Sequence, residues 1–116
     1  LGVATLKSQG IAESVLKNQD LYSYMDVVVG MNDSETMTKA DTIRQAMSTL
    51  CITNNVLMVG DSEYDFEGAV EVGVDFIGVL YGFGFKKEDA EIYSSKIKFI
   101  REPKELLNLV TAEFTK

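Results

Sequence analysis

The sequence predicts an α/β fold in which a parallel β-sheet carries helices on both faces. Short continuous apolar runs, typical of strands buried on both faces, alternate along the chain with segments of helical periodicity. No repeat, low-complexity tract or interdomain linker interrupts this alternation. The 116 residues also suit one domain of ordinary size.

The expected elements follow one another from a first strand to a last helix. Apolar runs predict strands over residues 1–5, 26–30, 55–60, 75–80 and 96–100. Amphipathic segments predict helices over residues 11–16, 40–50, 64–72, 87–93 and 103–114. Pro103 suits the first turn of the last helix, where its missing N–H is harmless.

Composition excludes several classes of protein. The net charge of −7 argues against a general nucleic-acid binder, and the absence of histidine excludes Ser-His-Asp and Cys-His catalysis and histidine zinc sites. The single cysteine, Cys51, permits no internal disulfide and favours a reducing, cytoplasmic setting. No apolar run approaches the roughly 18 residues of a membrane span, and no signal-peptide pattern opens the chain. The chain begins on Leu1, inside an apolar stretch, which suggests a piece of a longer protein.

Ligands of such sheets bind outside the carboxyl ends of the strands. The residues that follow the expected strands there are 5–7, 30–33, 60–62 and 81–84. We therefore expect the polar groups of four loops to meet at one edge of the sheet.

Two acids, Asp61 and Asp65, stand out among these groups. Ser62 and Asp65 match a capping box, which needs no chemistry, but Asp61 has no capping role. Two carboxylates within about 4–6 Å of each other raise one pKa unless a cation lies between them. Mg²⁺ prefers one or two carboxylates with waters and phosphate oxygens. The pair therefore predicts a magnesium site.

Lys39 and Thr5 are candidates for binding an anion. Thr38 is expected to cap a helix with Asp41 as its partner, so Lys39 falls in the first turn, where the helix dipole disfavours a cation by roughly 0.3–1 kcal/mol. Lys39 is either a solvated lysine or a group that neutralises an anion at the sheet edge. Thr5 either simply closes a strand or donates its hydroxyl to a phosphate.

Three stretches, "ATLK", "TKADTI" and "VGDSEYDFEGA", resemble in order and separation the conserved motifs of the haloacid dehalogenase (HAD) superfamily, in its phosphoglycolate phosphatase-like branch. "YSYMDVVVG" and "FIGVLYGFG" are also similar to segments of that branch. The resemblance implies a Rossmann-like three-layer core. It implies that Thr5, the backbone of Leu6 and Lys39 bind the substrate phosphoryl group, with Thr5 and Lys39 serving catalysis, and that Asp61 and Asp65 hold Mg²⁺.

The chain departs from the family pattern in two ways. Leu6 stands where the family usually has Asn or Ser, so a side-chain donor is lost. The Asp-x-Asp-x-Thr motif that supplies the nucleophile is absent, as is the cap domain. We therefore expect residues 1–116 to be the carboxyl-terminal part of a core domain, inactive alone. The first, central strand would be missing, so the strands of Thr5 and Asp61 should not be neighbours. An upstream segment of the same protein, or a swapped strand of a second copy, would fill the gap; the alternative is that the two halves of the sheet close up directly.

The resemblance implies Mg²⁺-dependent hydrolysis of a small phosphorylated metabolite through an aspartyl-phosphate, with no nucleic-acid or membrane partner. Two alternatives are a non-catalytic phosphate- or metal-binding module and a receiver-like signalling domain. The glycine-containing loop 81–84 is expected to line the rim of the pocket. It lacks the third glycine of a dinucleotide-binding fingerprint, so we expect no NAD binding.

Overall fold

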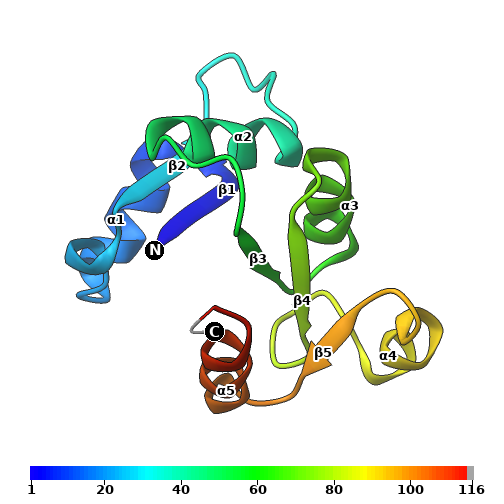
Figure 1. The fold of residues 1–116 in the computed structure, drawn as a ribbon. Helices are drawn as coiled ribbons and strands as arrows, with labels where there is room; N and C mark the ends of the chain where they lie inside the picture. The colour runs from blue at the N-terminus through cyan, green and yellow to red at the C-terminus, as the bar shows by residue number, and fades with distance from the viewer. Residues whose placement is uncertain (115–116) are drawn as a thin grey trace. The chain divides into compact units, whose positions relative to one another are not determined.

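The computed structural model describes the backbone of residues 1–114 and the side chains of residues 1–111 (Figure 1). The last two residues of the predicted domain, 115 and 116, lie outside the described part. The strands are β1 (Gly2–Ser8), β2 (Val27–Met31), β3 (Leu57–Gly60), β4 (Asp75–Val79) and β5 (Lys98–Ile100). The helices are α1 (Gln9–Asn18), the 3₁₀ turn η1 (Tyr22–Tyr24), α2 (Lys39–Thr49), α3 (Glu63–Val72), α4 (Lys87–Tyr93) and α5 (Pro103–Phe114).

Every predicted strand and helix is present, and the differences lie at their ends. The first strand was expected to end at Thr5 but continues to Ser8, where the Ser8 hydroxyl caps α1 by accepting a hydrogen bond from Ile11 N at 3.4 Å. The sequence prediction missed η1, which ends with the hydrogen bond from Met25 N to Tyr22 O. The predicted capping box of α2 is confirmed, because Thr38 and Asp41 bond reciprocally.

The chain divides into two compact units, Leu1–Asn54 and Asn55–Lys116. Each unit has its own parallel sheet, with the strand order β1-β2 in the first and β3-β4-β5 in the second. This confirms the α/β fold class with parallel strands. No helix in the described part of the chain is both long and apolar enough to span a bilayer.

In the first unit, β1 and β2 pair in a regular register that sets Gly2 opposite Val27 and Ala4 opposite Val29. The register then breaks and resumes at Ser8, so Thr5 lies in an irregular part of the strand. Helices α1 and α2 both pack on this small sheet. Their buried apolar side chains, together with those of the strands, form its core, which consists of Ala12, Val27, Val29, Ala40 and Ile43.

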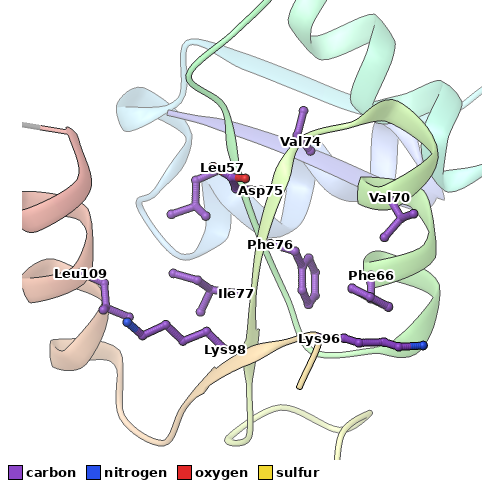
Figure 2. A pocket seen from close by; sticks show the side chains of 10 residues that line it. All are labelled: Leu57, Phe66, Val70, Val74, Asp75, Phe76, Ile77, Lys96, Lys98 and Leu109. Atoms are coloured by element: carbon purple, nitrogen blue, oxygen red, sulfur yellow. The ribbon is translucent and has the colours of Figure 1, made fainter. Parts of the chain in front are cut away.

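The second unit is a helix–sheet–helix sandwich. Figure 2 shows Phe76 and Ile77, neighbours on β4, on opposite sides of the strand. Phe76 points toward Phe66 of α3, and Ile77 points toward Leu109 of α5. This alternation is the period of two expected of a strand buried on both faces. On the α5 side, the core consists of Ile77, Val79 and Ile100, with Leu106 and Leu109 packed against it.

Aromatic rings fill the opposite side of this sheet. Phe85, which is only 4% exposed, lies at their centre. Its ring centroid is 5.1 Å from that of Phe99, 6.3 Å from that of Tyr93 and 6.4 Å from that of Phe76, in edge-on contacts. Such edge-on pairs are favourable beyond the area they bury. The segment that follows β4 is therefore anchored in the core by Phe85.

Candidate active site

The two predicted metal ligands lie together at the carboxyl end of β3. Asp61 follows the last strand residue, and Asp65 lies in the first turn of α3. The Ser62 hydroxyl caps α3 by accepting a hydrogen bond from Asp65 N at 3.3 Å. The expected capping box is only half formed, because the carboxylate of Asp65 accepts its hydrogen bond from Asp61 N, at 3.1 Å, rather than from Ser62. The Asp65 carboxylate thus accepts its hydrogen bond from the backbone of Asp61, the residue before the N-cap.

Gly60 allows this close approach between the strand end and the helix. A Cβ at position 60 would collide with the Cβ of Asp65 and would lie 2.5 Å from its Oδ2. Asp65 itself is buried, with 9% of its surface exposed. The last residue of β3 therefore has to lack a side chain for the acid pair to form.

A third segment, the loop 80–86 after β4, also holds Asp61. The backbone N–H of Phe83 donates to Asp61 Oδ2 at 3.1 Å, and that of Phe85 donates to the Asp61 carbonyl oxygen at 2.6 Å. The sequence placed this loop near the site but missed its bonds to Asp61. The signal that could have indicated them is the pair of glycines, Gly82 and Gly84, since glycine is common where two backbones approach closely.

The donor set of this site fits Mg²⁺. No group of three or more Asp, Glu, His or Cys side chains able to hold a metal occurs among the described residues, so a soft or all-protein metal cage is not formed by them. Mg²⁺ does not need one, because it keeps several waters and binds through one or two carboxylates plus substrate phosphates. Asp61 and Asp65 would hold it, with Asp61 Oδ2 oriented by Phe83 N.

The predicted phosphate-binding residues lie in the first unit. Thr5 is half-buried, and its Oγ1 accepts a hydrogen bond from Lys7 N at 3.2 Å. Leu6, between them, is 44% exposed and offers only its backbone to a ligand, as its side chain predicts. The hydroxyl of Thr5 keeps its own proton available for donation, because its bond to Lys7 uses a lone pair.

Lys39 is the first residue of α2 and approaches the same strand. Its Nζ donates to the carbonyl oxygen of Ala4 at 2.5 Å, and the residue is half-buried. The structure thus brings the ammonium of Lys39 next to the residue that precedes Thr5. The start of α2 is capped, because the backbone N–H of Thr38 donates to the Asp41 carboxylate. This hydrogen bond lowers the pKa of Asp41.

The four predicted side chains therefore form two local groups. Thr5 and Lys39 lie in the first unit, and Asp61 and Asp65 lie in the second.

The second unit contains a larger and a smaller hollow. A cavity of about 480 Å³ opens at the other end of the strands, where it is lined by their first residues, Leu57, Asp75 and Lys98 (Figure 2). None of the predicted site residues, which are Thr5, Leu6, Lys39, Asp61 and Asp65, lines it. A smaller hollow of about 200 Å³ has Ser62, Gly84 and Tyr93 in its wall, and neither Asp61 nor Asp65 lines it. There the Tyr93 hydroxyl donates to Glu63 Oε1 at 2.6 Å, which raises the pKa of Tyr93.

Comparison with known proteins identifies the family. Residues 1–79 match the family described as haloacid dehalogenase-like hydrolase, and the chain belongs to this family of hydrolases. Among solved structures, a predicted phosphatase from Clostridium acetobutylicum is 33% identical, with a TM-score of 0.86 over 97% of this chain and 52% of its own. A haloacid dehalogenase-like hydrolase from Streptococcus pneumoniae is 29% identical, with a TM-score of 0.83 over 94% of this chain and 51% of its own.

Two kinds of curated relative are similar in sequence. The tyrosine-protein kinase PtkA of Mycobacterium tuberculosis is 30% identical over 86 residues, which is 72% of this chain and 30% of PtkA. A proposed pyrophosphatase, PpaX, of Caldanaerobacter subterraneus is 32% identical over 113 residues, which is 93% of this chain and 49% of PpaX. The chain thus spans about half, or less, of the length of the curated relatives that it matches.

Proposed function

We propose that the chain is the carboxyl-terminal part of the catalytic core of a Mg²⁺-dependent phosphatase, similar to phosphoglycolate phosphatases, that acts on a small phosphorylated metabolite. One observation carries the proposal: in a chain of the haloacid dehalogenase-like hydrolase family, the buried Asp65 holds the backbone of Asp61 at the end of β3. The lone, exposed Cys51 supports a reducing, cytoplasmic setting as part of the same proposal.

Each residue has a role in this proposal. Asp61 and Asp65 would hold Mg²⁺, which when bound neutralises charge on the phosphoryl oxygens. Lys39 and Thr5, with the backbone N–H of Leu6, would bind the phosphoryl group through charge and hydrogen bonds. The contact of Lys39 Nζ with Ala4 O supports its part, because it holds the ammonium beside Thr5.

The covalent step belongs to residues upstream of this chain. An Asp carboxylate there would attack phosphorus and release the alkoxide, which a second Asp protonates, and water would then hydrolyse the acyl phosphate to free phosphate and the original carboxylate. The chain itself would supply phosphate binding and the metal ligands.

The strand order supports an added strand from that upstream segment. Strand β1, which carries Thr5, pairs with β2, and strand β3, which precedes Asp61, pairs with β4. Strands β1 and β3 therefore belong to different sheets and do not pair with each other. Each buried backbone group left unpaired costs on the order of 1–3 kcal/mol. A strand from the amino-terminal part of the same protein, or one swapped from a second copy, would pair with an open sheet edge of this kind.

A second candidate is phosphoryl transfer to tyrosine. The 30% identity to PtkA over 72% of this chain favours it over other kinase reactions. The receiver-like alternative is set aside by the family match, whereas the non-catalytic phosphate- or metal-binding module differs from the phosphatase only in the upstream nucleophile.

The test uses the intact protein from which the chain comes, freed of metal by a chelator. Phosphate release is measured from p-nitrophenyl phosphate, phosphoglycolate, a nucleoside monophosphate and pyrophosphate, with and without Mg²⁺. We expect Mg²⁺-dependent release from at least one ester. Incubation with ATP and mass spectrometry for phosphotyrosine tests the kinase candidate. Mg²⁺ binding without either reaction would overturn the phosphatase in favour of the non-catalytic module.

A further inference from the structure

We infer that the loop 80–86 is a positioning element for the metal ligand Asp61, and that the backbone N–H of Phe83 and the missing side chains of Gly82 and Gly84 set the affinity for Mg²⁺. The inference rests on the proposed magnesium site and adds to it three positions that act on Asp61 through the loop backbone.

The backbone N–H of Phe83 holds one carboxylate oxygen of Asp61. At 3.1 Å it joins a rigid backbone donor to a charged acceptor, and such bonds are stronger than neutral ones. With one oxygen held by the loop, the carboxylate cannot rotate freely about its terminal torsion. Outer-shell bonds of this kind orient metal-binding side chains, and removing them typically costs about 10–100-fold in metal affinity.

The two glycines let the loop backbone come this close. A Cβ on Gly82 would collide with the Cβ of Asp61 and would lie 2.5 Å from Oδ2. A Cβ on Gly84 would collide with the Asp61 carbonyl oxygen. One glycine therefore faces the carboxylate and the other faces the main chain, so a side chain at either position would push Asp61 away from its present place.

The loop can position Asp61 because it is itself fixed. Phe85 is 4% exposed, packs on three aromatic rings and donates its backbone N–H to Asp61 O at 2.6 Å. By contrast, the Phe83 side chain is fully exposed, at 103% of its reference surface. Position 83 therefore acts through its backbone donor and not through its ring. The effect of losing the Phe83 ring can therefore be measured separately from the effect of losing the Phe83 N–H.

This separation gives a matched pair of variants, Phe83→Pro and Phe83→Ala, in the intact parent protein. Both remove the exposed ring, but only proline removes the N–H that bonds Asp61. Calorimetric titration with Mg²⁺ measures the dissociation constant, and unfolding in the presence of a chelator measures stability separately. We expect Phe83→Pro to weaken Mg²⁺ binding by about 10-fold or more and Phe83→Ala to change it by less than about twofold. Equal affinities of folded Phe83→Pro and wild type would overturn the inference.

Two further measurements keep the inference testable if Phe83→Pro does not fold. Gly82→Ala should weaken Mg²⁺ binding, whereas Gly10→Ala, whose Cβ would meet nothing within 4 Å, should leave it unchanged. In wild type, the amide resonance of Phe83 should shift as Mg²⁺ is added; an unmoved resonance at saturation would overturn the inference. Failure of the wild type to bind Mg²⁺ would instead overturn the proposed metal site itself.

Discussion

The carboxylate of Asp65 accepts a hydrogen bond from the backbone N–H of Asp61, with 3.1 Å between Oδ2 and N. The second acid of the pair thus fixes the main chain that carries the first. Because Asp65 is buried and Ser62 already caps α3, this bond links the end of β3 directly to the start of the helix. The acid one helical turn after Asp61 thus has a structural role at the candidate site, because it fixes the backbone of Asp61.

Asp61→Asn in the intact protein should weaken Mg²⁺ binding by at least about 10-fold, because a neutral amide replaces a charged ligand. Calorimetric titration with Mg²⁺ provides the measurement. Asp75→Asn is the matched control, since Asp75 is an exposed acid at the first residue of β4, at the other end of the strands. If both variants lost the same affinity for Mg²⁺, the loss would come from the change in net charge, and Asp61 would not be a metal ligand.

Gly60→Ala should lower the free energy of unfolding by about 1–3 kcal/mol, because the new methyl group would collide with Asp65 in a packed region. Gly10→Ala, in the first turn of α1 and in open space, should leave stability unchanged or raise it slightly. Denaturant unfolding of the two variants checks this. If the two variants had equal free energies of unfolding, the end of β3 and α3 would be able to move apart with little loss of stability.

Lys39→Ala should lower turnover by about 10²–10³-fold and leave the circular dichroism spectrum unchanged, because the ammonium would neutralise charge on the phosphoryl group. Steady-state hydrolysis of p-nitrophenyl phosphate by the intact protein is the measurement. Lys17→Ala, on α1, is the control for loss of a surface lysine, and its turnover should remain within about twofold of wild type. If Lys39→Ala behaves in the same way, Lys39 takes no part in binding the phosphoryl group, and its bond to Ala4 O is only structural.

Tyr93 should be the tyrosine that resists ionisation at alkaline pH. Its hydroxyl donates to Glu63, and ionisation would both lose this bond and place two negative charges together, so the pKa is raised above 10.0. Because the folded pKa lies above the unfolded one, the contribution to stability is complete below about pH 10 and is lost as the pH rises through the raised value. In an absorbance titration of tyrosine ionisation, the transition at the highest pH should be missing from the Tyr93→Phe variant. An unchanged highest transition would contradict the assignment.

Much of this protein could be predicted from local sequence. The order of strands and helices, the caps at Thr38 and Ser62, and the place of Asp61 directly after β3 depend on side chains within a few positions of one another. Periodicity and capping are short-range effects, so one sequence suffices to indicate them. The family resemblance, now confirmed over residues 1–79, rests on the same local motifs.

The tertiary structure alone decided what holds Asp61 in place. The register of β3 on β4 sets Gly60 opposite Gly78, and the chain that leaves β4 then returns to Asp61 through Phe83, which is 22 positions away in sequence. Neither the bond nor the need for glycine at 82 and 84 follows from residues nearby in the chain, because both depend on which strands pair and in what register. The same holds for Lys39, whose ammonium reaches Ala4 only once α2 has packed on β1. The sequence determined which groups follow the strands, and the packing of strands and helices decided which of them meet.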